Sequence, residues 1–244
     1  NLKETGEFMT STAESINIEA FFKISYGLYI VSAGNSNNKS GYISNAVFQV
    51  TAEPAQFAIC CSKNNYTASL IEENRAFAIS VLKQNTDQSL ISTFGYKSGK
   101  DIDKFSGVNS ITGITGSPIV TDDTLAWFEC RVVQGVDVGT HMLFTAEIVN
   151  TKLIEDGEPL TYSFYREVRK GKAPKNAPTY IDTEKNQSKE STSEKYKCLL
   201  CGNIYDPAEG DTEGKIPPGT EFKDLPDSWQ CPVCGTDKGS FDRI

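Results

Sequence analysis

Four cysteines near the C-terminus constrain this 244-residue chain more than any other feature. They lie in two Cys-x-x-Cys-Gly turns separated by 29 residues: Cys198, Cys201, Cys231 and Cys234. Each turn can direct two thiolates at one metal ion, and its glycine can adopt the left-handed conformation that points backbone N–H groups at the sulfurs. Two disulfides are the alternative, and they are unusual in a sequence with no recognisable secretory signal. The spacing therefore predicts a tetrahedral four-thiolate site for iron or zinc.

Five aromatic residues accompany the cysteines, in a C-terminal unit that has no long helical or strand pattern. They are Tyr196, Tyr205, Phe222, Trp229 and Phe241. In so short a unit, aromatic side chains and a metal must supply the core that chain length cannot. Cysteines and aromatics together resemble rubredoxin over residues 195–244. The resemblance implies a mononuclear iron centre that carries one electron, with zinc as a substitute that the same cage accepts, whereas the spacing alone also allows a structural zinc ribbon.

Composition divides the chain into two domains. Residues 183–195 contain no apolar side chain, and they predict a flexible linker with an average span of roughly 20 Å. A surface helix is the alternative, because Glu and Lys are good helix formers. We expect an N-terminal extension at 1–17, a main domain at 18–182 and a small cysteine domain at 196–244.

The net charge of −8 is shared equally by the two parts of the chain. Residues 196–244 hold 5 basic and 9 acidic side chains, and residues 1–195 hold 19 and 23, so each part carries −4. The small domain is the more densely negative, which argues against nucleic acid and favours a partner with a basic docking face; acidity for solubility alone is the alternative. No stretch approaches the roughly 18 apolar residues of a membrane helix, so we expect a cytoplasmic protein without a membrane partner.

Short strand patterns dominate the region before the linker. Six segments are rich in Val, Ile, Phe and Tyr and are bounded by turn residues: 29–33, 47–51, 57–61, 77–82, 125–133 and 141–148. They predict a mainly β domain, a closed antiparallel barrel. Short helices are expected over 17–26, from Thr67 as an N-cap, and after Asp87. The absence of a Gly-x-Gly-x-x-Gly fingerprint and of a P-loop disfavours a Rossmann fold.

Five motifs in this region, taken together, resemble the FMN-binding split-barrel flavin reductases. They are SNAVFQVTAEP (44–54), CSKNNYT (61–67), FGYKSGKD (94–101), GTHMLF (139–144) and APKNAPTY (173–180). The match covers about residues 18–182, and the subgroup that it resembles is the one fused to rubredoxin, the high-molecular-weight rubredoxins. The resemblance implies an antiparallel, Greek-key-like split β-barrel with short helices, bound FMN, and a homodimer with FMN near the interface.

The residue types suit a flavin mononucleotide. A cation, two amides and a hydroxyl gather at a strand-to-helix turn, where a helix N-terminus favours phosphate. These residues are Lys63, Asn64, Asn65 and Thr67, and the expected opposite wall of the phosphate site is Ser98, Gly99 and Lys104. The flavin ring is expected along a strand and against a second apolar wall, with Asn45, Phe48, Gln49, Val50 and Thr51 on the strand and Phe94 opposite. The alternatives are an exposed polar loop with a helix cap and an ordinary half-buried strand.

His141 is the only histidine in the chain, which excludes a site with several histidine ligands. The Gly-x-His motif of the family implies that it borders the flavin and the nicotinamide, as a candidate catalytic residue; a structural histidine at the start of a strand is the alternative. Cys60, Cys61 and Cys130 are expected to be small buried apolar residues, with the adjacent Cys60 and Cys61 on opposite faces of a strand.

The two expected cofactors complement each other. NADH or NADPH delivers two electrons as a hydride, whereas one rubredoxin iron accepts a single electron, so a flavin must stand between them. The resemblance thus implies an NAD(P)H:rubredoxin oxidoreductase whose external acceptor is a flavodiiron protein that reduces oxygen or nitric oxide. Two other functions remain open: a flavin reductase that releases reduced flavin, and a non-enzymatic electron carrier reduced by a separate enzyme.

Overall fold

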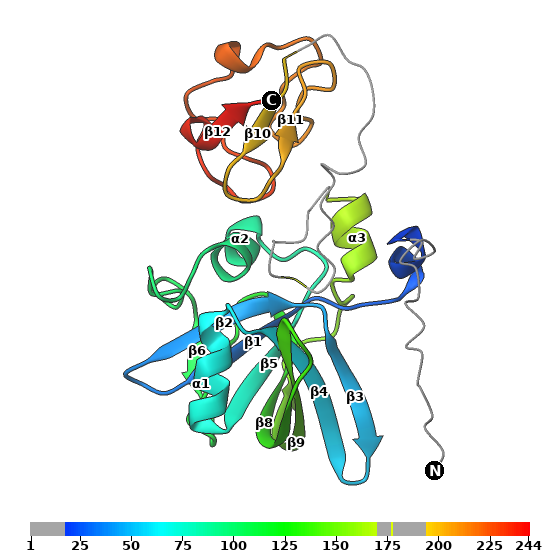
Figure 1. Cartoon of the computed structure of the whole chain (residues 1–244), viewed down its shortest axis with the longest axis vertical. Helices are drawn as coiled ribbons and strands as arrows, with labels where there is room; N and C mark the ends of the chain where they lie inside the picture. Colours follow the sequence, from blue (N-terminus) through cyan, green and yellow to red (C-terminus); the bar gives the residue numbers. More distant parts are fainter. Residues whose placement is uncertain (1–17, 170–176, 178–193) are drawn as a thin grey trace, which may run out of the picture.

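The computed structural model describes residues 18–169, residue 177 and residues 194–244. The expected N-terminal extension at 1–17, most of the expected linker and part of the expected end of the main domain lie outside the described residues. The chain forms a β-rich main domain and a small cysteine domain that lies next to α2 of the main domain (Figure 1). No helix in the described ranges is long and apolar enough to cross a membrane.

The main domain is built on a seven-stranded antiparallel sheet with the order β2-β1-β5-β8-β9-β4-β3. The strands are β1 (Tyr29–Gly34), β2 (Lys39–Ser44), β3 (Val47–Ala52), β4 (Ala55–Ser62), β5 (Ala76–Leu82), β8 (Thr124–Asp137) and β9 (His141–Leu153). The sheet curls until β2 meets β4, where the Tyr42 hydroxyl donates to the Cys60 carbonyl at 3.0 Å. The hydrogen-bonded ladder does not close, because β2 and β3 are the two edges of the sheet, so the closed barrel expected from the strand patterns was wrong and the fold is the antiparallel split barrel that the resemblance implies.

The strand count differs from the expected six because β2 has no alternating apolar pattern. Its sequence, KSGYIS, is held by pairing with β1 from Tyr29↔Ser44 to Gly34↔Lys39. Gly41 in β2 lets the strand approach Phe94 closely, since a Cβ there would lie 2.9 Å from the ring. Strands β8 and β9 extend beyond the expected ends because they pair with each other along a long hairpin. A further short hairpin joins β6 (Ser110–Thr112) and β7 (Pro118–Val120).

The helices are short, as expected. They are α1 (Tyr66–Asn74), α2 (Gln88–Tyr96) and α3 (Tyr162–Glu167), preceded by the 3-10 turn η1 (Ile18–Lys23), which is shorter than the expected helix over 17–26. The N-cap of α1 is Asn65, whose side chain accepts from the Thr67 N–H at 3.0 Å, so the expectation of Thr67 as the cap was wrong. Asp87 caps α2 as expected and accepts from the Ser89 N–H at 2.7 Å.

Two clusters of buried side chains fix α1 and α2 on the sheet. The first packs Leu70 and Ile71 of α1 against strand residues such as Phe144. The second surrounds Phe94 near the end of α2, whose ring meets that of Phe105 edge to face at 5.4 Å. The cofactor pocket described below lies between these two helices, so its walls are set by both clusters.

The cysteine domain has little regular structure, as expected for its length. Its elements are β10 (Tyr196–Cys198), β11 (Ile204–Tyr205), β12 (Phe241–Arg243) and the 3-10 turns η3 (Phe222–Asp224) and η4 (Lys238–Ser240). Aromatic residues form the core: Tyr196 stacks on Phe222 at 4.0 Å, and the buried Trp229 Nε1 donates to Asp211 at 2.7 Å. The last residues of the expected linker pack on this domain, since Lys195 forms an ion pair with Asp206 at 2.7 Å.

Candidate metal centre and cofactor pocket

The four cysteine sulfurs lie within 4.8 Å of one another in the buried centre of the cysteine domain. Cys198 Sγ is 3.6 Å from Cys234 Sγ, and Cys201 Sγ is 3.6 Å from Cys231 Sγ. Four sulfurs placed about 2.3 Å from a central metal form a tetrahedron with edges of about 3.8 Å. Sulfurs in a disulfide would be only about 2.05 Å apart. The residues therefore fit a single four-thiolate metal ion.

The cysteine turns favour the thiolate form at the first sulfur of each pair, Cys198 and Cys231, whereas hydrogen bonding with Cys198 raises the pKa of Cys201 and Cys234. Gly202 and Gly235 have φ values of 75° and 70°, in the left-handed region that glycine tolerates. Hydrogen bonds from neighbouring thiols, that of Cys201 first, and from the Cys201 backbone N–H hold the pKa of Cys198 well below its ordinary value. The second turn repeats the backbone N–H bond to its first sulfur. Such N–H groups favour a charged sulfur and hence a metal–thiolate bond.

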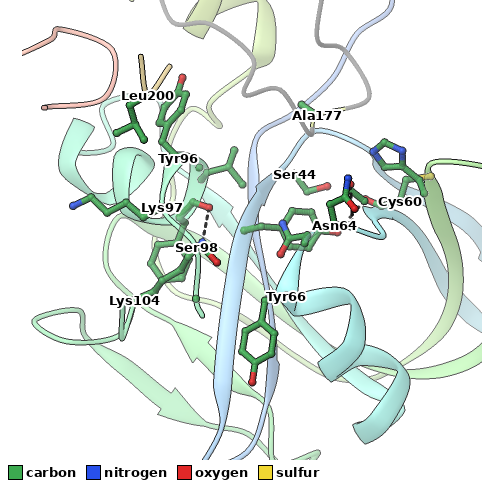
Figure 2. Close-up of a pocket in the computed structure, with 18 residues that line it drawn as sticks. Ser44, Cys60, Asn64, Tyr66, Tyr96, Lys97, Ser98, Lys104, Ala177 and Leu200 are labelled. Atoms are coloured by element: carbon green, nitrogen blue, oxygen red, sulfur yellow. Dashed lines mark hydrogen bonds between the residues drawn. The ribbon is translucent and has the colours of Figure 1, made fainter. Parts of the chain in front are cut away.

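A pocket opens on the main domain between β2, the turn before α1 and the segment after α2 (Figure 2). Seven of the residues expected to contact the cofactors line it: Asn64, Asn65, Phe94, Ser98, Gly99, Lys104 and His141. They come from four separate segments of the chain, and the sheet brings them together. Gly99 lies close to β2, where a Cβ would be 2.2 Å from Ser40 Oγ, so the backbone at this wall has no room for a side chain.

Two residues of the expected phosphate turn lie outside the pocket lining. Lys63 Nζ forms an exposed ion pair with Asp137 at 2.5 Å, at the end of the β8–β9 hairpin. Thr67 is fully buried, and its hydroxyl donates to Ser40 Oγ at 3.1 Å. Both side chains thus have partners within the main domain.

The expected flavin-contacting strand, β3, also lies away from the pocket of a single chain. Asn45 is buried between β2 and β3, whereas Phe48 and Val50 are 55% and 45% exposed. Gln49 Nε2 donates to the Thr51 carbonyl at 3.3 Å along the strand. β3 is the last strand in the sheet order, and every one of its residues after Val47 is exposed in the single chain.

Lys104 is a buried cation beside the pocket. It is 3% exposed, and its ammonium donates to the carbonyls of Gly41 at 2.8 Å and Phe94 at 3.1 Å. Burial lowers its pKa to about 8. No carboxylate in the described residues forms an ion pair with it, so its charge is met by the two carbonyl dipoles and by the face of the Phe94 ring, whose centroid is 5.8 Å from Nζ. A buried, uncompensated ammonium at a pocket wall favours an anionic ligand.

His141 also lines the pocket, as the first residue of β9 and paired with Ser62 of β4. Its Nδ1 is 2.8 Å from Thr140 Oγ1. Cys60 and Cys61 point to opposite faces, as expected, but Cys60 is only half-buried and lines the pocket, so its assignment as a core residue was wrong. Burial raises the pKa of Cys61 to about 12, in keeping with an inert core thiol.

Sequence reasoning missed several pocket residues, of which Tyr96 and Leu200 matter most here. Tyr96 lies within the FGYKSGKD motif, and Leu200 lies between two of the metal-binding cysteines (Figure 2). The motif could have identified Tyr96. No local signal identifies Leu200, because it reaches the pocket only when the cysteine domain lies against the main domain.

Family comparison agrees with this pair of sites. Residues 21–171 match the flavin reductase like domain, and residues 195–241 match rubredoxin. The chain belongs to the flavin reductase-like family and carries a C-terminal rubredoxin domain. The pocket therefore lies in an FMN-binding flavin reductase-like domain, and the four cysteines are a rubredoxin iron site.

Three known proteins show the extent of the similarity. High molecular weight rubredoxin of Moorella thermoacetica is 40% identical over 94% of this chain and 100% of its own length. Ferric-chelate reductase (NAD(P)H) of Archaeoglobus fulgidus is 43% identical over 69% of this chain and 100% of its own length. The crystal structure of a putative flavin reductase from Haemophilus somnus shares the fold, with a TM-score of 0.54 at 24% identity over 60% of this chain and 95% of that one.

Proposed function

We propose that this flavin reductase-like protein oxidises NADH or NADPH and passes the electrons through FMN to its own rubredoxin iron. One observation carries the proposal: Leu200, between Cys198 and Cys201, lines the cofactor pocket. Tyr96 also lines the pocket and packs against the core of the cysteine domain. A cofactor in the pocket and a metal held by the cysteines are thus bridged by side chains that touch both sites.

The electron count requires both cofactors. One NAD(P)H gives up a hydride, which carries two electrons, and the single rubredoxin iron would take them one at a time, with the external acceptor reoxidising Fe(II) to Fe(III) between the two transfers. The products are NAD(P)⁺, one proton and an acceptor reduced by two electrons. FMN supplies the conversion from two-electron to one-electron transfer when it is bound. The protein residues bind and orient the cofactors; none has to move a proton in the hydride step.

We place the FMN phosphate between the start of α1 and the Ser98–Gly99 segment. Asn64 and Asn65 offer polar groups at the N-terminus of α1, where the helix dipole favours an anion. Lys104 adds positive charge at the wall of the pocket. His141, which lines the same pocket, then borders the flavin ring and the nicotinamide of the electron donor.

Two further features belong to the proposal. A homodimer is supported by the exposed Phe48 and Val50 on the outermost strand, and in a dimer β3 would contribute the expected flavin contacts to a shared site. The proposed external acceptor is a flavodiiron protein. Its support is the charge of −4 on residues 196–244, which fits a redox partner with a basic docking face.

Anaerobic reduction of the pure protein tests the relay. Mixing with NADH or NADPH should bleach the flavin absorption and the thiolate-to-iron absorption in the same sample, without an added carrier. Cys231→Ser should abolish the iron absorption and leave flavin reduction by the nicotinamide intact. Iron that stays oxidised while the flavin is fully reduced would exclude the relay.

Ferric-chelate reduction is a second candidate function, because the relative named for that activity matches the main domain over its full length. In this case electrons would leave the flavin for a soluble iron chelate, and the rubredoxin iron would not be required. Cys231→Ser decides between the two routes. Two results together would favour the second function. The variant would reduce ferric chelates as fast as the unmodified protein does, and the unmodified protein would reduce protein acceptors no faster than the variant does.

A further inference from the structure

Helix α2 carries three residues spaced four apart that contact the cysteine domain. At this spacing Gln88, Ser92 and Tyr96 lie on one face of the helix. The Ser92 hydroxyl donates to the carbonyl of Cys234, and Gln88 Nε2 donates to the carbonyl of Val233. Both acceptors are backbone atoms of the second cysteine turn. The two donors therefore recognise the shape of a metal-binding turn.

Tyr96 extends this row of contacts to the pocket. Its ring packs against the core of the cysteine domain, and its hydroxyl lies 3.2 Å from that of Tyr165 on α3. Burial, and then the charge of the neighbouring Tyr165, raises the pKa of Tyr96 well above its ordinary value. Tyr96 is thus a neutral, confined aromatic ring between the pocket and the cysteine sulfurs. We call Gln88, Ser92 and Tyr96 the α2 stripe.

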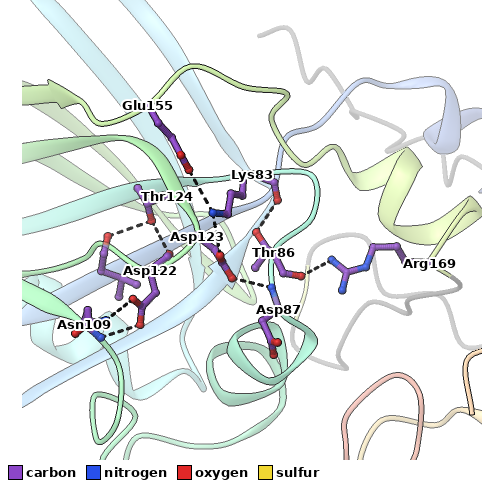
Figure 3. A network of polar contacts seen from close by, with 10 residues as sticks. Lys83, Thr86, Asp87, Asn109, Asp122, Asp123, Thr124, Glu155 and Arg169 are labelled. Carbon is purple, nitrogen blue, oxygen red and sulfur yellow. Dashed lines mark hydrogen bonds and ion pairs between the residues drawn. The ribbon is translucent and has the colours of Figure 1, made fainter.

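A polar network surrounds Thr86 and Asp87, the two residues just before α2 (Figure 3). The carboxylate of Asp123 accepts from the Asp87 backbone N–H at 2.7 Å, just before the helix, and pairs with Lys83 at 3.2 Å. Arg169 donates to the Thr86 carbonyl at 2.8 Å and to Gln88 Oε1 at 2.9 Å. Because the guanidinium occupies the amide oxygen, the amide nitrogen of Gln88 is directed at the cysteine turn.

Charge complements these contacts. Arg169 and Glu213 line the same groove between the domains. Burial raises the pKa of Glu213, and the charge of Arg169 opposes that rise. Ser92 is 4% exposed, so its hydroxyl is covered where it meets the cysteine turn. Few polar contacts and one aromatic contact suit a reversible encounter of the kind that electron-transfer partners make.

We propose that the α2 stripe is the docking surface for the rubredoxin domain, with the second cysteine turn on the helix and the first at the pocket. Ser92 and Gln88 act as positioning residues that fix the orientation of the metal site relative to the pocket. The effect on iron reduction rests on the proposed function, whereas the docked arrangement itself does not.

Small-angle X-ray scattering of the full chain tests the docking directly. The unmodified protein should show the radius of gyration of the docked arrangement, and Ser92→Arg should show a larger one because a long cation replaces the buried hydroxyl. The matched control is Ser69→Arg on α1, where the serine is exposed and lies outside the interface. Flavin content and circular dichroism establish that each variant is folded.

Stopped-flow reduction of the same proteins adds the kinetic readout. Ser92→Arg should slow iron reduction about tenfold or more, since docking loses its fixed geometry, while flavin reduction by NAD(P)H stays within about twofold. Gln88→Ala should slow iron reduction about threefold, as expected for one lost hydrogen bond. An unchanged radius together with an unchanged iron rate in Ser92→Arg would overturn the proposal, as would an extended unmodified protein. If the unmodified iron is never reduced, the relay fails, and the scattering still decides the docking.

Discussion

Replacing the buried Lys104 with Met tests the assignment of the phosphate site. Methionine has a similar length, so the main loss is the charge. Burial lowers the pKa of Lys104 from 10.5 to about 8, which corresponds to a cost of about 3 kcal/mol for keeping the ammonium charged. Met removes this cost but leaves the carbonyls of Gly41 and Phe94 without a donor, at about 1–3 kcal/mol each. These effects oppose each other, so the unfolding free energy should change by about 3 kcal/mol or less.

The binding of FMN should change much more than the stability. A hydrogen bond to a charged group contributes about 1.5–3 kcal/mol, so Lys104→Met should weaken FMN about 10- to 150-fold. Riboflavin has no phosphate and should bind almost as before. Fluorescence titration of the flavin-free protein with both ligands at neutral pH measures the ratio. The matched control is Lys63→Met, because Lys63 is an exposed lysine paired with Asp137 and does not line the pocket.

The pH dependence of flavin binding provides a second, independent check of the same assignment. Below about pH 8 the side chain of Lys104 is charged in the folded protein, and above it the charge is lost. The preference for FMN over riboflavin should therefore decline as the pH rises through 8, and it should be flat in Lys104→Met. Because the folded pKa is depressed, the burial cost disappears between about pH 8 and 10.5, where the unmodified protein should gain stability relative to the variant. Equal weakening of both ligands, or a loss seen only in Lys63→Met, would refute the assignment.

Three further predictions concern separate parts of the molecule. Trp229→Phe removes the buried donor to Asp211 and should destabilise the cysteine domain by about 1–3 kcal/mol, seen as loss of iron absorption at a lower temperature. His141→Ala should slow flavin reduction by NAD(P)H more than it weakens FMN; unchanged kinetics would make His141 structural. Replacing residues 183–193 with an equally long Gly/Ser segment should preserve the rate of iron reduction, because the length sets the effective concentration, and a large decrease would give these residues a specific role.

The sequence predicted the metal site well because its information is local. Each pair of ligands is separated by two residues on one tight turn, and all five core aromatic residues lie between the turns or within ten residues of one. The same holds for the cap at Asp87, where the acceptor and the donor are two residues apart. In these cases, spacing alone determines which atoms can meet.

The pocket was less predictable because its residues meet through tertiary contacts. Strand β2 has no apolar alternation, and its pairing with β1 comes from the hairpin. Lys63 has the right charge next to the right turn, but Asp137, 74 residues further along the chain, provides its partner. Leu200 and Tyr96, which meet at the pocket, are even further apart in the sequence than Lys63 and Asp137. The α2 stripe has a helical spacing that can be read from the sequence, but its partner cannot.

We propose that electrons pass from the pocket to the rubredoxin iron within one assembled protein. Stopped-flow mixing with NADH or NADPH under anaerobic conditions, at two protein concentrations about tenfold apart, tests it most directly. If transfer occurs within one assembled protein, flavin absorption should fall first and iron absorption should follow. The rate constant for iron reduction should be the same at both concentrations. An iron rate constant that rises in proportion to protein concentration, or iron reduction that requires added free flavin, would contradict it.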